Sequence, residues 1–280
     1  MNSVLVVGGT GKVGRKVVAD LTVAGVRTRA LVRDPAAAGL PPEVEVVRGD
    51  LAEPGSLAAA ADGVDSVLLI WPFHDTGNAE RAVRALSGPD RRLVYLSSTT
   101  VNDEGPQSDL IPLLHAEMEA VVEAHASEWT VLRADTLASN ALSWAGQIRA
   151  GAVVRGFAVA PSAVVHEGDV AAVAARLLTE PGHAGRKYLV TGPRVVGRAE
   201  QVEAIGAALG RELRFEAQPV GVARESMTAA GLPVHLIEVL LSMAEFRPPS
   251  ELVTSVVADL TGRPARDIRD WAAEHAAAFR

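Results

Sequence analysis

The segment that most constrains the fold is a glycine-rich stretch, Gly8–Gly14, which directly follows a strand-like run and directly precedes a helical pattern. At such a junction glycines permit a tight turn, a close approach of the backbone to a phosphate, and close contact between helix and strand. The helix is expected to begin at about Lys12, so its first N–H groups and the positive end of its dipole face the phosphates. The segment predicts a dinucleotide-binding unit, with a purely structural glycine turn as the alternative.

The end of the second strand-like run indicates which dinucleotide the unit takes. Sites for NAD place an acidic residue there, whereas sites for NADP place an arginine. Arg33 lies 19 residues beyond Gly14, and Lys12 can add a second cation for the phosphate. We therefore expect NADP(H) in preference to NAD(H). Arg33 could instead be a solvated strand-end charge, and Asp34 could serve a ribose in an NAD site. The loop residues expected to bind the cofactor are Gly8, Thr10, Gly11, Lys12, Val13 and Gly14.

Short runs rich in Val and Leu alternate with amphipathic stretches along the first half of the chain, as in the βαβ units of a parallel sheet. The runs are apolar on both faces, as expected where helices cover both sides, and right-handed crossovers make such a sheet doubly wound. We predict an α/β fold: a doubly wound parallel-sheet Rossmann fold with a smaller, mostly helical C-terminal part that binds substrate. The predicted strands are Ser3–Val7, Arg27–Val32, Val44–Val47, Ser66–Trp71, Leu93–Ser97 and Trp129–Arg133.

After Arg133 the pattern becomes irregular, which suggests a division of labour. We expect residues 1–135 to form the dinucleotide-binding domain, with residues 163–192 rejoining its sheet. Residues 136–162 and 193–280 would then form the substrate-binding part. The elements expected here are a helix around Ala141–Arg149 with a glycine-punctuated return, a helix capped by Asp169 that runs to about Leu178, strands at Lys187–Thr191 and Leu213–Ala217, and a final helix from about Pro264 to Phe279.

The fourth predicted strand should end in the crevice at the carboxyl edge of the sheet, beside the ribose and the nicotinamide. Ile70, Trp71 and Pro72 are therefore expected to bind the cofactor. Trp71 and Phe73 could form a wall for the nicotinamide ring, although aromatic side chains at such positions can also belong to the core.

Three residue types are absent or rare in this sequence, which excludes several catalytic mechanisms. The 280 residues include no Cys, only two Tyr (Tyr95 and Tyr188) and three Lys, so that 24 of the 27 basic residues are Arg. Without Cys there is no thiolate nucleophile, no disulfide and no Cys-ligated metal. The pair His74 and Asp75 also lacks the tight spacing to a third ligand that a metal site needs. We expect no metal.

The charge pattern narrows the partners further. The formal net charge is −7 at pH 7 and the basic residues form no stripe, which argues against nucleic acid. No apolar run reaches the ~18 residues that span a bilayer, and the first residues resemble a strand rather than a targeting segment. We expect a cytoplasmic protein with a small-molecule substrate, without nucleic-acid or membrane partners. A homodimer or a protein partner remains open.

The glycines fit two registers, Gly9-x-Gly11-x-x-Gly14 and Gly8-x-x-Gly11-x-x-Gly14. The second resembles the extended and atypical branches of the short-chain dehydrogenase/reductase superfamily. A helix bearing His115 and Glu119, the motif Thr130-Val131-Leu132-Arg133 and the downstream Asn140 closely resemble the NmrA-like family of atypical members. The Gly262-Arg263-Pro264 tail is likewise typical of its bacterial members, and the resemblance covers nearly the whole chain.

The resemblance implies roles for several residues and also implies that a catalytic Tyr/Lys pair is missing. It implies that Asp50 and the backbone of Leu51 contact the adenine, although Asp50 could simply begin the loop that leads into the Ser56 helix. It also implies that Ser97 occupies the superfamily's serine position. The catalytic branches use a Tyr whose pKa is lowered by a Lys four residues later. Tyr95 is followed at that distance by Thr99 and Tyr188 by Gly192, so this acid is absent.

A replacement proton donor is suggested by two residues on one helix face. Glu119 lies four residues after His115, where it could raise the pKa of the imidazole and make it a donor near neutral pH; a surface ion pair is the alternative. The catalytic candidates are His115 and Ser97. Ser97 and Ser98 could bind substrate oxygen or cap local backbone. The expected substrate pocket comprises Phe73, Ser98, His115, Asn140 and Trp144.

The absence of the Tyr acid makes some classes of substrate easier to reduce than others. Hydride addition to a ketone gives a strongly basic alkoxide that needs a positioned acid, whereas an iminium needs no proton and a quinone gives a weakly basic anion. We predict an NADP(H)-dependent reductase of a small, largely apolar electrophile: a quinone, an enone or an iminium. The resemblance leaves a second candidate, a non-catalytic NADP(H)-binding redox sensor that acts through a protein partner. A redox-neutral isomerase is a third.

Overall fold

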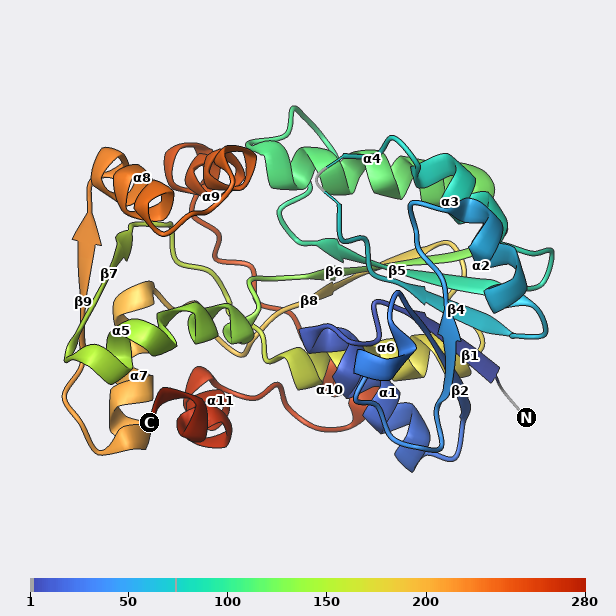
Figure 1. The fold of residues 1–280 in the computed structure, drawn as a ribbon, viewed down its shortest axis with the longest axis horizontal. Helices are drawn as coiled ribbons and strands as arrows, with labels where there is room; N and C mark the ends of the chain where they lie inside the picture. Colours follow the sequence, from blue (N-terminus) through green and yellow to red (C-terminus); the bar gives the residue numbers. More distant parts are fainter. Residues whose placement is uncertain (1–2, 74) are drawn as a thin grey trace.

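The computed structural model describes residues 3–73 and 75–280, apart from the side chains of residues 245 and 246. Its centre is a seven-stranded sheet in the order β3-β2-β1-β4-β5-β6-β8, in which all neighbouring strands run parallel (Figure 1). This order confirms the predicted doubly wound fold. The strands are β1 Ser3–Val7, β2 Arg27–Val32, β3 Glu45–Arg48, β4 Ser66–Leu69, β5 Arg92–Ser98, β6 Glu128–Ala134 and β8 Arg186–Val190.

Helices cover both faces of the sheet, because its strands are apolar on both sides (Figure 1). One face carries α1 (Lys12–Val23), α6 (Glu167–Thr179) and α10 (Val256–Thr261), which bury a cluster that includes Val17 and Leu177. The other carries α2 (Pro54–Ala61), α3 (Ala79–Leu86) and α4 (Leu110–His125), which bury a cluster that includes Leu57, Val83 and Met118. A short 3₁₀ turn, η1 (Pro35–Ala37), follows β2.

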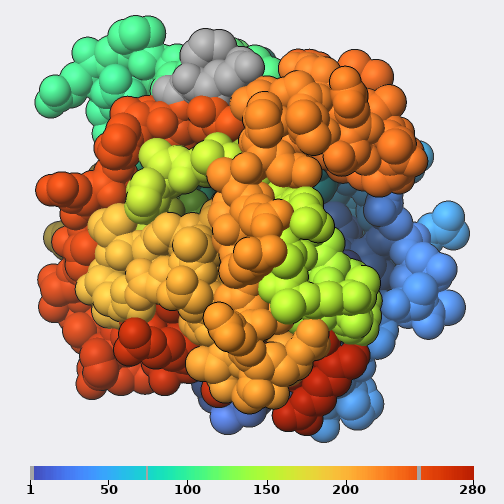
Figure 2. All heavy atoms as spheres, turned by 90° about the vertical axis from the view of Figure 1, so that its left-hand side faces the viewer, coloured from blue at the N-terminus to red at the C-terminus, as the bar shows by residue number. Residues whose placement is uncertain are grey.

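A smaller part lies beyond the carboxyl ends of the main strands, at the left of Figure 1. Its core is a two-stranded parallel sheet of β7 and β9, and Figure 2 turns this end towards the viewer. β9 lies one residue beyond the predicted strand, and β7 forms where only a glycine-punctuated return was expected. The elements are η2 Ala138–Trp144, α5 Ala145–Ala150, β7 Val153–Phe157, α7 Arg198–Leu209, β9 Arg214–Gln218, α8 Val220–Ala229, α9 Val234–Phe246, α11 Ile268–His275 and η3 Ala276–Phe279.

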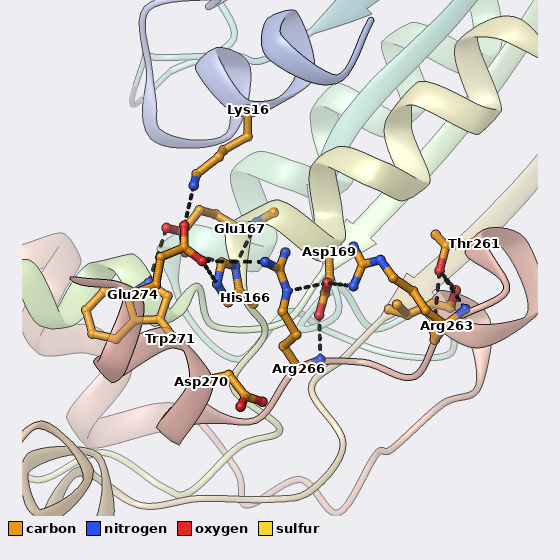
Figure 3. Close-up of polar contacts among 12 residues, drawn as sticks. Lys16, His166, Glu167, Asp169, Thr261, Arg263, Arg266, Asp270, Trp271 and Glu274 are labelled. Atoms are coloured by element: carbon orange, nitrogen blue, oxygen red, sulfur yellow. Dashed lines mark hydrogen bonds and ion pairs between the residues drawn. The ribbon is translucent and has the colours of Figure 1, made fainter. Parts of the chain in front are cut away.

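The start of α6 differs from the sequence prediction. The cap is His166, whose Nδ1 accepts a hydrogen bond of 3.0 Å from the Gly168 N–H, and not Asp169. Asp169 lies inside the first turn, fully buried, and its carboxylate binds the guanidinium groups of Arg263 and Arg266 (Figure 3). The helix begins at Glu167, so His166 stands at the N-cap position and Asp169, two residues into the helix, is free to pair with the two arginines of the C-terminal segment.

This cluster fastens the C-terminal segment to the nucleotide-binding half. Glu274 of α11 accepts hydrogen bonds from Lys16 of α1 at 2.6 Å and pairs with His166 at 3.0 Å (Figure 3). The indole N–H of Trp271 donates to buried Glu167 at 3.2 Å. The last helix therefore contacts both α1 and α6, although it lies far from them in the sequence. Within the described ranges, no helix is both long and apolar enough to cross a bilayer.

Candidate active site

The glycine loop follows β1 at the point where the strand order reverses between β1 and β4, the usual place for a ligand crevice in such a sheet. Gly8 has φ +92°, and its carbonyl accepts the Gly11 N–H at 3.0 Å. A Cβ at Gly14 would lie only 2.1 Å from the Gly8 carbonyl oxygen. Helix α1 begins at Lys12, as predicted, and no described side chain caps it. The loop thus leaves the first N–H groups of α1 without a side-chain partner.

Two basic side chains hold this loop in place. Arg15 donates to the carbonyls of Thr10, Ala38 and Gly39 at 2.9–3.0 Å. Lys12 reaches the carbonyl of Ser139 in η2 at 3.0 Å, and burial lowers the pKa of its amine while the charge of Glu167 opposes the shift. The loop therefore contacts the segment that carries the predicted substrate residues.

The residues predicted to bind the adenosine half of the cofactor, and to distinguish NADP from NAD, lie at the ends of β2 and β3. Arg33 is exposed and makes no hydrogen bond or ion pair with any described residue. Asp34 caps η1 by accepting the Ala36 N–H at 3.0 Å. Asp50 accepts the Ala52 N–H at 2.9 Å, and Leu51 is buried. Both acids thus have local backbone partners, while the guanidinium of Arg33 is open to solvent. Their roles toward a cofactor stay predictions.

The end of β4 places an aromatic pair beside the crevice. Gly8 lies against Ile70, because a Cβ on that glycine would approach the Ile70 Cβ to 2.9 Å. Trp71 is 8% exposed and meets Phe73 edge to face with ring centroids 5.1 Å apart. Pro72 between them is exposed. The indole N–H of Trp71 donates to the Asp75 carbonyl at 2.9 Å, which fixes this turn. His74 lies outside the described residues.

His115 pairs with a tyrosine and not with Glu119. The hydroxyl of Tyr95 in β5 lies 2.7 Å from Nδ1 of His115 in α4. Burial lowers the pKa of His115 to about 4, with Glu119 opposing the shift and Arg247 adding to it. The prediction that Glu119 makes this imidazole a charged donor near neutral pH is therefore wrong, because desolvation exceeds the attraction of a carboxylate that is itself neutralised elsewhere.

Glu119 is the centre of an ionic group, hereafter the Glu119 cluster, formed with Ser97, Asp103, Arg133 and Lys187. Glu119, Arg133 and Ser97 are buried, whereas Asp103 and Lys187 reach the surface. Arg133 is 3% exposed and forms two-pronged hydrogen bonds to Glu119 at 2.6–2.9 Å and to Asp103 at 2.6 Å. Lys187 of β8 lies 3.1 Å from Glu119. Burial alone would raise the pKa of Glu119, but the hydrogen bonds from Arg133 and Ser97 hold it below its usual value.

The hydroxyl group of Ser97 joins this cluster as a hydrogen-bond donor. Its hydroxyl donates to Glu119 at 2.5 Å, so it has no proton for a substrate oxygen while that bond is made. Ser98, next along β5, accepts the Thr100 N–H at 3.2 Å and bonds the Thr100 hydroxyl at 2.8 Å. Both serines thus have local partners in the structure.

The remaining predicted pocket residues lie in η2. Asn140 is exposed and follows Ser139, whose carbonyl binds Lys12. Trp144 is half-buried and packs on Phe215 of β9, with ring centroids 6.1 Å apart. The structure therefore brings Asn140 near the glycine loop and places Trp144 against the small sheet. Whether these residues touch a substrate stays a prediction.

Several polar residues of the site did not figure in the sequence prediction. Tyr95 was expected only as an interior strand residue. Asp103, which pairs with Arg133, and Lys187, which pairs with Glu119, lie 30 and 54 positions from Arg133 in the sequence. One signal was present: Arg133 stands in a strand that is otherwise apolar on both faces, and a buried charge requires a partner. Within residues 3–73 and 75–280, no group of three or more His, Asp or Glu could hold a metal ion.

The NAD(P)H-binding family model matches residues 8–181. The chain is 41% identical over 281 residues to the (4-alkanoyl-5-oxo-2,5-dihydrofuran-3-yl)methyl phosphate reductase of Streptomyces griseus, with 99% of each chain covered. It is 34% identical over 282 residues to the NAD(P)H azoreductase of Xenophilus azovorans, again with 99% of each chain covered.

Solved structures share the fold at lower identity. The NADPH-dependent quinone oxidoreductase of Escherichia coli, complexed with NADPH, superimposes with a TM-score of 0.79 at 21% identity over 97% of this chain and 99% of that chain. The triphenylmethane reductase of Citrobacter, complexed with NADP(H), gives a TM-score of 0.80 at 21% identity over 98% and 99%. The architecture is common to all three proteins.

Proposed function

The chain belongs to the NAD(P)H-binding family, in the NmrA-like, atypical branch of the short-chain dehydrogenase/reductase superfamily, and on that premise we propose that it is an NADPH-dependent reductase of a conjugated enone. Membership confirms the family predicted from the motifs. The chain is an NAD(P)H-dependent oxidoreductase, since both relatives are named as reductases and the Xenophilus azovorans enzyme is named for NAD(P)H. The enone and the preference for NADPH are the parts of the proposal that need testing.

The residues of the crevice fit a dinucleotide. The start of α1 has no side-chain cap, and the absence of a Cβ at Gly14 lets this helix pack closely against the Gly8 carbonyl. The first N–H groups of α1 are therefore free to bind a pyrophosphate. Arg33, exposed and without a described partner, lies at the end of β2, where a 2′-phosphate would be recognised. Ile70 and Trp71 directly follow β4, and Ile70 lies against Gly8 of the loop. When bound, the cofactor supplies a hydride.

The choice of an enone rests on the missing acid and on the first relative. The substrate for which the Streptomyces griseus enzyme is named carries a ring alkene whose α-carbon bears the alkanoyl group and adjoins the lactone carbonyl. Reduction of such an alkene at its β-carbon moves the π electrons into an enolate that both carbonyl oxygens share. This anion is far less basic than an alkoxide, so water can protonate its α-carbon afterwards without a Tyr/Lys pair.

The observation that carries the proposal is the hydrogen bond between Tyr95 and His115. Burial, reinforced by the charge of Glu119, raises the pKa of Tyr95, so the phenol keeps its proton. The only described partner of its hydroxyl is Nδ1 of His115, which is neutral at physiological pH. The phenol therefore donates to Nδ1, and the imidazole proton resides on Nε2. We assign this neutral N–H the task of stabilising enolate oxygen.

The test is NADPH consumption by the purified protein with three substrates: a 4-alkanoyl-5-oxo-2,5-dihydrofuran, a simple quinone and a saturated ketone. We expect turnover in that order, with no measurable rate for the ketone. Tight NADPH binding without consumption of any of them would overturn the proposal and favour a redox sensor.

The cofactor preference has its own test in Arg33→Ser. The variant should bind NADPH about tenfold more weakly, because one charge-assisted contact to the 2′-phosphate is lost, and should bind NADH as the wild type does. Arg27→Gln, which removes an exposed arginine from the opposite end of β2, is the matched control. Equal losses for both cofactors would contradict the role of Arg33.

A further inference from the structure

The first turn of α1 carries an arginine at a position that disfavours a basic residue. Arg15 directly follows Gly14, and its backbone N–H donates to the Gly11 carbonyl at 3.0 Å. The positive end of the helix dipole repels a cation here, and this turn contains no acidic residue that could compensate. Arg15 therefore destabilises the start of the helix unless its guanidinium makes contacts elsewhere.

The guanidinium of Arg15 joins two loops at the edge of the sheet where the cofactor is expected. Its Nε donates to the Thr10 carbonyl of the glycine loop at 3.0 Å. Its Nη1 and Nη2 donate to the Gly39 and Ala38 carbonyls, both at 2.9 Å, in the connection between β2 and β3. Three of the five N–H groups of a guanidinium are thus used, all on backbone carbonyls. Hydrogen bonds from a charged donor are stronger than neutral ones, so this side chain links the two loops firmly.

The turn that follows Arg33 is held less firmly by its own backbone. Two backbone hydrogen bonds, to the carbonyls of Asp34 and Pro35, close this turn at 3.3 Å, longer than a good hydrogen bond. The carboxylate of Asp34 adds one bond of 3.0 Å, to the Ala36 N–H. All three bonds lie within the turn. The bonds from Arg15 are shorter and come from α1, so they fix the end of the turn relative to the glycine loop.

We propose that Arg15 is a positioning residue for recognition of the 2′-phosphate of NADPH: by fixing residues 34–39 against α1, it holds Arg33 where the phosphate binds. Arg33 is exposed, and Asp34, the cap of the turn, is its neighbour in the chain. A long exposed side chain loses conformational entropy on binding, and a backbone that is already fixed reduces the total loss. Arg15 thus acts on the phosphate through Arg33. This inference rests on the proposed preference for NADPH.

The same contacts fix the spacing between the two phosphate positions of the cofactor. The pyrophosphate is expected at the first N–H groups of α1, and the 2′-phosphate at Arg33. NADPH must engage both positions at once, whereas NADH engages only the first. Loss of the link made by Arg15 should therefore weaken the binding of NADPH more than that of NADH.

The experiment measures the dissociation constants of NADPH and NADH by fluorescence titration of the purified protein and compares their ratio among variants. Arg15→Gln should lower the preference for NADPH about fivefold, less than the roughly tenfold loss expected of Arg33→Ser, because a residue that acts through Arg33 cannot remove more than Arg33 contributes. Arg27→Gln, exposed at the opposite end of β2, should leave the preference unchanged. An unchanged preference in Arg15→Gln would overturn the inference.

Two further variants separate positioning from charge. In an Arg33→Ser background, Arg15→Gln should cause no further loss of preference, because its effect passes through the guanidinium that is already missing. Arg15→Lys keeps the positive charge but cannot span three carbonyls, so it should lose most of what Arg15→Gln loses. Additive losses in the double variant, or a wild-type preference in Arg15→Lys, would show that Arg15 acts by its charge alone and would refute the positioning role.

These titrations require no turnover, so they are independent of the reductase reaction. If the wild type binds NADPH without reducing any substrate, the variants still decide the role of Arg15. If the wild type binds NADPH and NADH equally well, the proposed preference for NADPH and this inference fail together. A preference that survives in Arg15→Gln but is lost in Arg33→Ser contradicts this inference alone.

Discussion

Two regions of the site work by opposite means. In the glycine loop the fold depends on side chains that are missing, since a single Cβ at Gly14 would strike the Gly8 carbonyl oxygen. In the Glu119 cluster the fold depends on side chains that satisfy one another's hydrogen bonds, since Arg133 donates to two carboxylates. The glycine loop leaves backbone N–H donors open to a ligand, whereas almost every polar atom of the Glu119 cluster is bonded within the protein.

The difference indicates how binding and rigidity are distributed. The loop is built to accept something, whereas the cluster ties α4, β5, β6 and β8 together and so fixes the helix that carries His115. Damage to the loop should abolish binding and leave the fold, and damage to the cluster should weaken the fold first. The predictions below test that separation.

The largest effect is expected from Arg133→Met. This change leaves the buried carboxylate of Glu119 with its strongest partner removed, which should lower the free energy of unfolding by about 3–5 kcal/mol. Urea denaturation at neutral pH measures it. The double variant Glu119→Gln, Arg133→Met removes both charges and should recover much of the loss. A single variant within about 1 kcal/mol of the wild type would refute the importance of the cluster.

Gly14→Ala should have the second-largest effect, and the property affected should be the affinity for NADPH. The added methyl forces the loop apart at a cost of about 3 kcal/mol, so NADPH affinity should fall roughly 100-fold in a fluorescence titration. Gly55→Ala, at a helical glycine with open space around its Cβ position, is the control and should bind normally. If both variants bind NADPH equally well, the loop does not act as a close-fitting cradle.

Tyr95→Phe should have a smaller effect that belongs to the chemical step. Without the phenol, Nδ1 of His115 loses its partner and the tautomer is no longer fixed, so kcat should fall up to about tenfold with little change in NADPH affinity. Tyr188→Phe is a close control, because Tyr188 makes the same 2.7 Å contact with His183. Equal losses of kcat in the two variants would show a general cost of removing a hydroxyl.

A further effect concerns the pH dependence of stability. His115 has its pKa lowered to about 4 in the folded chain, below the ~6.5 of an unfolded histidine. As pH falls from about 6.5 towards 4, the unfolded chain takes up this proton first, so stability present above that window is lost through it. His115→Gln should flatten this slope in urea denaturation at a series of pH values. Identical slopes for variant and wild type would contradict a neutral buried imidazole.

The same two regions show what the sequence could predict. The position of the loop between β1 and α1 was predicted correctly, because glycine spacing and a flanking strand and helix are local properties. The members of the Glu119 cluster were not, because Asp103 and Lys187 come from a loop and from the returning strand β8, and only the fold brings them together with Arg133 and Glu119. Asp169 and Glu119 were misjudged for one shared reason: each carboxylate is claimed by arginines that no local pattern reveals.

The three lysines carry a practical consequence for anyone who labels this protein. Lys12 holds Ser139, Lys16 holds Glu274 and Lys187 holds the Glu119 cluster, so acylation of any lysine removes a contact between distant segments. Amine-directed dyes and surfaces would therefore perturb what they report. The chain has no cysteine, and Val23 at the end of α1 is 90% exposed. Val23→Cys would give a single, accessible attachment point away from every contact described above.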